Sequence, residues 1–222
     1  MRSGVLFDVD GTLVDTTYLH TVAWWEALRQ LGADVPMARI HRAIGMGSDK
    51  LLDHLLGDAR DRDQDEQAST AHDVLYGAWW ERLRPLPGAA ELLRAVAERG
   101  IAVVLASSAK EPELKQLRRV VGADDVIAAA TSSSDAEESK PAPDILQAAI
   151  EQSGVDPGAA VFVGDSVWDV QAAARLSIPC IGLVCGGTSA DELSEAGAVA
   201  VYDDPAALLA ALDDSVIAKL PT

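Results

Sequence analysis

The first apolar run of the chain ends abruptly in acidic residues. Residues 5–7 lead directly into Asp8, Val9 and Asp10, and Gly11 follows. This pattern is typical of a buried strand that presents polar residues at the carboxyl edge of an open α/β sheet, where ligands usually bind. Alternation along an extended strand would place Asp8 and Asp10 on the same side. The same residues also fit a plain strand end with an Asp-Gly turn, so the rest of the chain has to decide between a site and a turn.

From about residue 16 to residue 84 the apolar positions recur at helical spacing, and no strand pattern is present. The first apolar stripe, over residues 17–31, contains Leu19, Val22, Trp25 and Leu28. The second contains Leu51, Leu52, Leu55 and Leu56. The third contains Ala71, Val74, Leu75, Ala78 and Trp79. Helices with such stripes bury one face against a neighbour. We therefore predict an all-helical cap domain over residues 16–84, inserted after the first strand.

Two prolines and a glycine in residues 84–88 then interrupt the helical pattern, and the rhythm of the chain changes. Strand patterns are predicted at 101–106, 126–130, 160–163, 179–184 and 199–201. They alternate with helices predicted at 88–99, 111–121, 143–153, 167–176 and 205–212. Repeated strand–helix units form a parallel sheet covered on both faces. The predicted fold class is thus α/β, a Rossmann-like three-layer core over residues 1–15 and 85–222.

The composition and charge of the chain argue against some classes of binding partner. Of 222 residues, 49% are hydrophobic and 24% charged, which is typical of a folded globular chain. The net charge of −17 argues against nucleic acid and against an anionic membrane, both of which are bound through clustered Lys and Arg. We find no signal-peptide pattern and no stretch long enough to span a bilayer. With Cys180 and Cys185 interpreted as buried thiols, we expect a cytoplasmic protein.

Three more predicted strands or loops deliver polar groups to the same edge of the sheet. Ser107 and Ser108 follow the second strand, Lys140 precedes a helix, and Asp165 follows a later strand, with Asp169 four residues further on. Singly, each fits a cap, a strand-end hydroxyl or a solvated lysine. Together with Asp8, they form the combination of acids, hydroxyl and lysine expected of a phosphoryl-transfer site with a hard metal ion. This combination favours a site at Asp8.

The polar residues at these strand ends match four ordered motifs, which are Asp8-x-Asp10-Gly11-Thr12, Ser107, Lys140 and Gly164-Asp165-x3-Asp169. In this order they resemble the motifs of the haloacid dehalogenase-like hydrolase superfamily. The helical block resembles the small cap of its phosphoglycolate phosphatase and β-phosphoglucomutase branch, so the resemblance covers the whole chain. It implies a sheet order of 5-4-1-2-3, in which the strand ending in Asp8 lies between those ending in Asp165 and Ser107.

The resemblance also implies roles for the motif residues. Asp8 would be the nucleophile that forms an aspartyl-phosphate, and Asp10 the general acid and base. Mg²⁺ would be held by Asp8, the Asp10 backbone carbonyl and Asp165, with Asp169 either a direct ligand or behind the ligands. The phosphoryl oxygens would be bound by groups from two loops and a lysine, namely Ser107, Lys140 and the N–H groups of Val9, Asp10 and Ser108. Dehalogenases of the family lack an acid at the Asp10 position, so dehalogenation is disfavoured.

Some candidate substrate-binding residues resemble those of phosphomutases, whereas one expected mutase residue is missing. His20 and Trp24, together with Lys110, resemble the mutase branch, although His20 also fits a helix surface and Trp24 a packed core. The loop containing Gly47 lacks the arginine that mutases use for a second phosphate, and Lys50 is a possible substitute.

We therefore expect a Mg²⁺-dependent phosphatase that acts on a small phosphorylated metabolite, of the phosphoglycolate or sugar phosphate type. A β-phosphoglucomutase-type phosphomutase and a non-catalytic module that binds a phosphorylated ligand are the alternatives. A monomer and a homodimer both remain open.

Overall fold

A parallel β-sheet forms the centre of the computed structural model, which describes residues 2–57 and 60–221. Within these residues its strands are β1 (Arg2–Phe7), β2 (Ala102–Ala106), β3 (Ile127–Thr131), β4 (Val155–Gly164), β5 (Cys180–Leu183) and β6 (Ala200–Tyr202). They lie in the order β3-β2-β1-β4-β5-β6, and each neighbouring pair is parallel. The predicted fold class is confirmed, and β1 lies between β2 and β4 as the resemblance implied.

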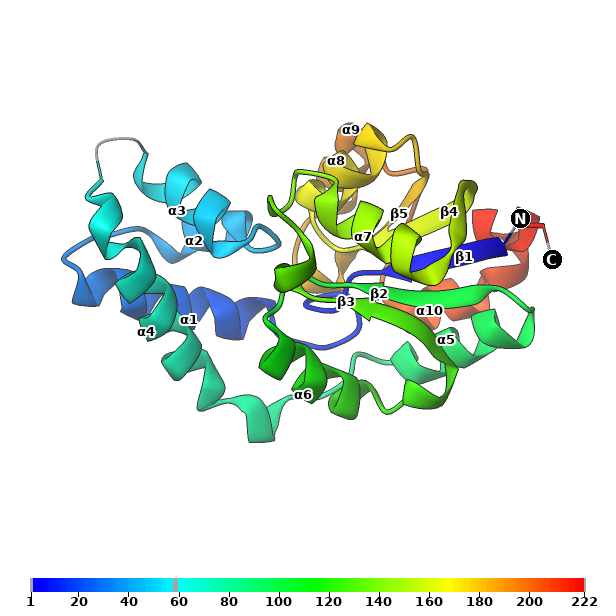
Figure 1. The fold of residues 1–222 in the computed structure, drawn as a ribbon, viewed down its shortest axis with the longest axis horizontal. Coiled ribbons are helices and arrows are strands. Elements are labelled where there is room, and N and C mark those ends of the chain that lie inside the picture. Colours follow the sequence, from blue (N-terminus) through cyan, green and yellow to red (C-terminus); the bar gives the residue numbers. More distant parts are fainter. Residues whose placement is uncertain (1, 58–59, 222) are drawn as a thin grey trace.

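Helices cover both faces of the sheet (Figure 1). They are α5 (Ala89–Glu98), α6 (Glu111–Val121), α7 (Asp144–Ser153), α8 (Val167–Arg175), α9 (Ala190–Ala196) and α10 (Pro205–Ala210). The strand period of two divides β1 between the faces: Val5 and Phe7 pack in one core cluster with Leu92 of α5, whereas Leu6 packs in the other with Leu146 of α7. Burial on both faces explains why these strands are continuous apolar runs.

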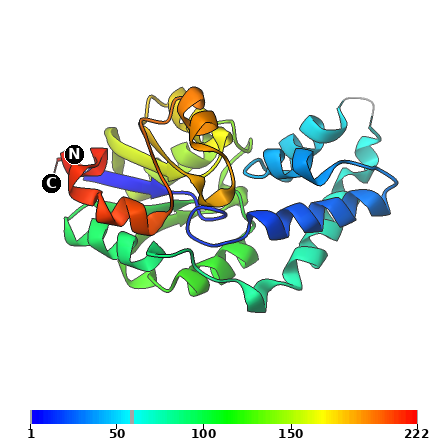
Figure 2. The same ribbon diagram turned by 180° about the vertical axis from the view of Figure 1, so that it is seen from behind.

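A second group of helices lies beyond one end of the sheet in both views (Figures 1 and 2). These are α1 (Thr17–Gln30), α2 (Met37–Ala43), α3 (Ser48–Leu56) and α4 (Asp65–Gly77). We call residues 17–82, so far as they are described, the helical region. Its own core cluster includes Trp24, Leu28, Ile40 and Leu52. The strands of the sheet point toward this region, so the polar groups at their carboxyl ends lie between the two parts.

The helical stripes differ from the prediction in two places. Val22 is 40% exposed and Val74 is 71% exposed, although both were expected to face inward. On α4 the buried positions are instead Ala68, His72 and Tyr76. The period was correct but the buried face was wrong, because α1 and α4 turn polar and aromatic side chains toward each other and toward the sheet edge.

Several element bounds also differ from the prediction. Helices α2 and α9 were not predicted, and each has only seven residues. Strand β4 begins at Val155 rather than residue 160, because Val155 pairs with Arg2 of β1 before a register shift. Cys180 lies buried on β5, whereas Cys185 lies beyond that strand and is partly buried; both are free thiols.

Candidate active site

Asp8, Lys140, Asp165 and Asp169 converge at the carboxyl ends of β1 and β4. The Nζ atom of Lys140 lies 2.6 Å from Oδ1 of Asp8 and 2.8 Å from Oδ1 of Asp169. One carboxylate oxygen from each of the three aspartates lies within 4.8 Å of the others. All four side chains are buried. The structure therefore brings together the acids and the lysine that the sequence placed at this edge.

The charges of this cluster do not balance. Burial raises the pKa of Asp8 to about 7 against the opposing charge of Lys140, and Asp169 and Asp10 add to the rise. Burial and the neighbouring carboxylates of Asp169 and Asp8 also hold the pKa of Asp165 well above its usual range. Burial alone would lower the pKa of Lys140, but Asp169 and Asp8 raise it. Lys140 is thus a fixed cation, and it cannot neutralise three carboxylates by itself.

A divalent cation fits this cluster. Three ionised carboxylates and one lysine leave two uncompensated negative charges in a buried place, which is costly unless a cation is bound. The donors are all oxygen atoms, the type that Mg²⁺ prefers. Asp165 has one oxygen, Oδ1, that accepts a hydrogen bond from Thr12 at 2.9 Å. A carboxylate accepts several contacts, so this hydrogen bond leaves Asp165 able to bind a metal ion as well.

The two oxygens of Asp169 have other partners. Oδ2 accepts hydrogen bonds from the backbone N–H of Ser166 at 3.0 Å and from its hydroxyl at 2.6 Å. Ser166 is the N-cap of α8 and forms a capping box with Asp169. Oδ1 is taken by Lys140. This arrangement favours a position for Asp169 behind the metal ligands rather than among them.

Glycines allow the backbone to approach Asp165 closely. Gly11 has a φ of +75°, in the left-handed region that favours glycine, and a Cβ there would lie 2.6 Å from Oδ2 of Asp165. A Cβ on Gly186 would lie 1.7 Å from the same oxygen. Any larger residue at Gly186 would displace the carboxylate. The conformation that the Asp-Gly pair adopts therefore serves the site as well as the turn.

The phosphate-binding candidates lie around this cluster with different exposures. Ser107 is fully buried, and its hydroxyl accepts a hydrogen bond from the N–H of Ala109 at 3.0 Å. Val9 is also fully buried, and its carbonyl accepts from the N–H groups of Leu13 and Val14. Ser108 and Asp10 line a cavity of about 210 Å³ above Asp8. These hydrogen bonds fix the conformation of the two loops, and the cavity is large enough for a small phosphate ester.

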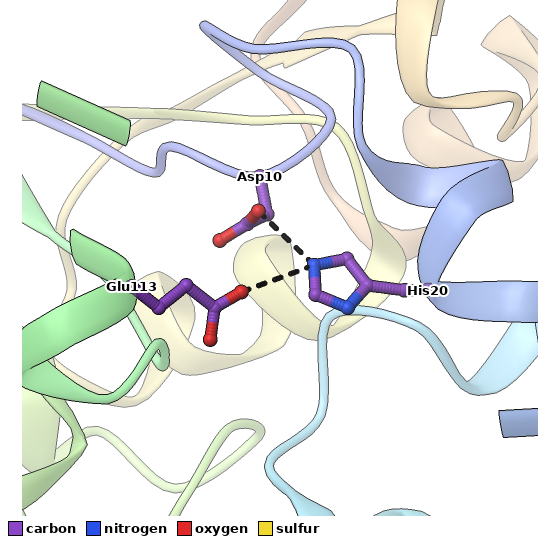
Figure 3. A group of neighbouring side chains, drawn as sticks. All are labelled: Asp10, His20 and Glu113. Carbon is purple, nitrogen blue, oxygen red and sulfur yellow. Dashed lines mark hydrogen bonds and ion pairs between the residues drawn. The ribbon is translucent and has the colours of Figure 1, made fainter. Parts of the chain in front are cut away.

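His20 joins the two parts of the molecule through Asp10 and Glu113 (Figure 3). Its Nε2 atom lies 3.2 Å from Oδ1 of Asp10 in the opening loop and 3.5 Å from Oε1 of Glu113 on α6. Burial alone would lower the pKa of His20, but the hydrogen bond and charge of Asp10 outweigh it and raise the pKa. Burial raises the pKa of Glu113 to about 7, against the charge of His20. The acid Asp10 thus shares one imidazole with a second acid.

A polar chain continues from His20 into the helical region. Nδ1 of His20 lies 3.1 Å from Nε2 of His72, and Nδ1 of His72 lies 3.2 Å from Oδ1 of Asp73. Asp73 also forms an ion pair with Lys110. Burial lowers the pKa of His72 to about 4, so this ring is neutral at pH 7. The ring of His72 stacks on Trp24, with centroids 4.4 Å apart.

The predicted substrate residues separate into two groups. His20, Trp24, Gly47 and Lys110 line the cavity, as described above for Asp10 and Ser108. Lys50 is not among the residues that line the cavity in the described part of the chain. Its Nζ atom instead lies 2.9 Å from Oε2 of Glu138. Lys50 is therefore not placed to substitute for the missing arginine.

Sequence reasoning missed His72, Asp73 and Glu113, all of which line the cavity. The available signal for His72 was its spacing of four residues from both Ala68 and Tyr76. No local pattern in the sequence marks Glu113, which reaches the cavity from the first turn of a helix that otherwise covers the sheet.

Comparison with known proteins places the chain in a family. Residues 3–176 match the model of the haloacid dehalogenase-like hydrolases. The phosphoglycolate phosphatase of Rhodospirillum rubrum is 31% identical over 94% of this chain and 90% of its own. The crystal structure of a hydrolase from Pseudomonas syringae has a TM-score of 0.91 at 33% identity, covering 96% of this chain and 99% of that one.

A structure of β-phosphoglucomutase from Clostridium difficile shares the fold, with a TM-score of 0.79 at 20% identity and 92% of both chains covered. The chain therefore belongs to the haloacid dehalogenase-like hydrolase family, in the branch that the motifs indicated. The predicted enzyme class, a phosphatase, is confirmed by this membership and these relatives. Among the helices of the described residues, none combines the length and the apolar character needed to cross a membrane.

Proposed function

We propose that this enzyme is a Mg²⁺-dependent phosphatase that hydrolyses a small phosphorylated metabolite through an aspartyl-phosphate on Asp8. The observation that carries the proposal is the position of Asp8: it is buried beside Lys140 and two further acids, and it lines the cavity that Asp10 also lines. The phosphoglycolate phosphatase relative supports the reaction class.

The first step is displacement at phosphorus. A carboxylate oxygen of Asp8 attacks the phosphorus atom, and the bond from phosphorus to the ester oxygen breaks. Asp10 gives a proton to the departing alcohol, and His20 beside it holds the Asp10 side chain in place. Lys140 offsets the negative charge around Asp8 so that an anionic phosphate can approach.

The second step releases phosphate. Asp10, now ionised, takes a proton from a water molecule as that water attacks the phosphorus, and the bond from phosphorus to the Asp8 oxygen breaks. Asp8 is thereby regenerated as a carboxylate. The N–H groups of Val9, Asp10 and Ser108 and the hydroxyl of Ser107 bind the phosphoryl oxygens in both steps.

Asp8, Asp165 and the backbone carbonyl of Asp10 would hold Mg²⁺, with Asp169 behind them. When bound, Mg²⁺ supplies positive charge next to the phosphoryl oxygens. Residues 16–84 act as a cap domain over the core of residues 1–15 and 85–222, and the helical region closes the cavity. This division rests on its separate core cluster and on contacts such as that of Asp49 with Ser139, at 2.6 Å.

A phosphomutase is the second candidate. His20 beside Asp10 favours it, because that histidine resembles the mutase branch. The pairing of Lys50 with Glu138 weighs against it, since a mutase must also hold a second phosphate. Phosphorus NMR of a hexose 1-phosphate with a trace of bisphosphate separates the two: a mutase would form the 6-phosphate without net release of phosphate. We propose the cytoplasm as its compartment, and either a monomer or a homodimer as its assembly.

The direct test is the substitution Asp8→Asn, assayed with Mg²⁺ and an aryl phosphate. We expect kcat to fall by roughly 10³-fold or more, since the nucleophile is lost. Asp15→Asn is the matched control, because Asp15 is an exposed acid at the end of the same loop. Full activity in Asp8→Asn would remove Asp8 from the mechanism. Zero turnover across a broad panel of phosphate esters, with ligand binding retained, would support the non-catalytic alternative.

A further inference from the structure

The wall of the cavity away from Asp8 is rich in acids. Beyond Asp8 and Asp10 it contains Asp49, Asp73, Glu113 and Glu137. Of the residues that the structure describes, Lys110 is the one Lys or Arg in this wall. Whatever part of a substrate extends away from its phosphate therefore faces mostly negative side chains.

Lys110 is already engaged. Its Nζ atom forms an ion pair with Asp73 and lies 3.4 Å from the hydroxyl of Ser69. Asp73 is further held by His72. An anionic group bound by Lys110 would also lie near Asp73, whose negative charge offsets that of the lysine.

Besides His20 and His72, the remaining polar side chains of the wall are hydroxyls. Ser48, Ser69, Ser108, Ser133 and Ser139 line it, together with the acids. Ionised carboxylates only accept hydrogen bonds, whereas hydroxyls both donate and accept. A carboxylate or a second phosphate on the substrate would meet acceptors with another acceptor. A hydroxyl or an ammonium group could donate to these acids, because a carboxylate has room for more acceptor contacts than the one or two that Asp49, Asp73 and Glu113 already make.

From this lining, and building on the proposed phosphatase function, we propose that the enzyme selects phosphate monoesters whose remaining part has no second negative charge and presents hydrogen-bond donors, either hydroxyl or ammonium. Esters with a carboxylate or a second phosphate are disfavoured by like-charge repulsion. This substrate class differs from the one in the name of the phosphoglycolate phosphatase relative.

The test compares three esters of matched size with wild-type enzyme and Mg²⁺. They are 2-hydroxyethyl phosphate, 2-aminoethyl phosphate and phosphoglycolate, which differ in the group at the far end. We expect kcat/KM for at least one of the first two to exceed that for phosphoglycolate by about 10-fold or more. The difference should shrink as salt is added, because salt screens the repulsion. The first two esters also show whether hydroxyl or ammonium is preferred.

Two matched variants locate the effect. Asp73→Asn removes one negative charge and releases Lys110, so the ratio of kcat/KM for phosphoglycolate over the 2-hydroxyethyl ester should rise by about 5-fold or more. Glu137→Gln removes the same charge from the wall but leaves the pair of Asp73 and Lys110 in place. It should raise that ratio by less than about 2-fold, since an exposed charge is well screened.

A preference of the wild-type enzyme for phosphoglycolate over both other esters would overturn this inference while leaving the phosphatase function intact. If neither the three esters nor an aryl phosphate were hydrolysed, the phosphatase function would be overturned, and the inference with it. The wild-type comparison decides the matter even if Asp73→Asn does not fold.

Discussion

The cavity lies between two walls: the core wall, at the carboxyl ends of the strands, and the helical wall, on α1 and α4. Acids at the core wall form ion pairs with a buried lysine, whereas polar groups of the helical wall contact one another and aromatic rings. Lys140 contacts Asp8 and Asp169 directly below the cavity. In the helical region His20 and His72 lie against each other, and Trp24 stacks on His72. The first arrangement concentrates charge for a metal and a phosphate. The second places the two histidines and the pair of Asp73 and Lys110 among the further acids that the rest of the substrate would face.

The difference shows how chemistry and selectivity are divided in this fold. The acids of the core wall come from strand ends and loops that the sheet fixes in place. The polar groups of the helical wall lie on α1 and α4, which can diverge in sequence without disturbing the sheet. Substitutions in the core wall should therefore change stability and kcat together, and substitutions in the helical wall should change activity or selectivity alone.

The largest effect on stability is expected for Lys140→Met. It leaves two carboxylates buried without their cation, which should lower the free energy of unfolding by about 3–5 kcal/mol in EDTA. Urea unfolding measures this, and added Mg²⁺ should restore part of the loss. Lys50→Met is the control, because Lys50 and Glu138 form a partly exposed pair that contributes less than about 1 kcal/mol. Equal effects of the two substitutions would contradict a special stabilising role for Lys140 between the buried acids.

When no metal is bound, a lower pH should stabilise the folded protein through Asp8. The pKa of Asp8 rises from 3.8 to about 7 on folding, so between these values the folded protein holds a proton that the unfolded chain has lost. The free energy of unfolding should therefore fall as the pH rises from about 4 to about 7. Bound Mg²⁺ displaces that proton, so the stabilisation by Mg²⁺ should grow over the same range.

Thermal unfolding at about pH 5 and about pH 8, in EDTA and in MgCl₂, tests this prediction. The difference between wild type and Asp8→Asn isolates the Asp8 contribution from those of Glu113 and His72. Burial shifts the pKa of His72 in the opposite direction, so this comparison is needed. A wild type whose stability in EDTA has the same pH dependence as that of Asp8→Asn would contradict the assigned shift.

His20→Asn should affect activity more than stability. Without the imidazole, Asp10 loses the contact that holds its side chain near the leaving oxygen, and kcat should fall by about 10²-fold, at the low end of what proton transfer contributes. Steady-state kinetics with an aryl phosphate measure it. His54→Asn is the control, since His54 is exposed and away from the cavity wall. A His20→Asn enzyme with unchanged kcat would show that Asp10 acts without this contact.

The smallest effect is expected at Val74, which lies on the outer face of α4. Because it is 71% exposed, Val74→Ser should change the free energy of unfolding by less than about 0.5 kcal/mol. Leu28→Ala, on the buried face of α1, should cost about 2–5 kcal/mol. Chemical unfolding of both variants checks which helix faces are buried. A loss at Val74 comparable to that at Leu28 would favour the face that the sequence pattern predicted.

The two walls also differ in how far the sequence predicts them. Asp8, Lys140 and Asp165 could be placed together, because the carboxyl ends of parallel strands meet at one edge of a sheet. The adjacency of β1 with both β2 and β4 came from the family resemblance, since spacing alone does not order the strands. The burial of these strands on both faces of the sheet explains why they are such clear apolar runs.

The helical wall was less predictable for a physical reason. A hydrophobic stripe identifies the buried face only when apolar residues occupy it, and α4 buries His72 and Tyr76 while exposing Val74. The pairing of Lys110 with Asp73, and of Lys50 with Glu138, depends on how the helical region sits against the core. Long-range side-chain pairs of this kind leave no trace in local spacing.

The most direct test of the account is to trap the covalent intermediate. Enzyme mixed with Mg²⁺ and a rapidly hydrolysed phosphate ester is quenched and treated with borohydride, which reduces an acyl phosphate to an alcohol. Peptide mass spectrometry then locates the modified residue. If Asp8 is the nucleophile, homoserine should replace aspartate at position 8, and Asp10 should be unmodified. Reduction at Asp10 or Asp165 instead, or steady turnover without any reduced aspartate, would contradict Asp8 as the nucleophile.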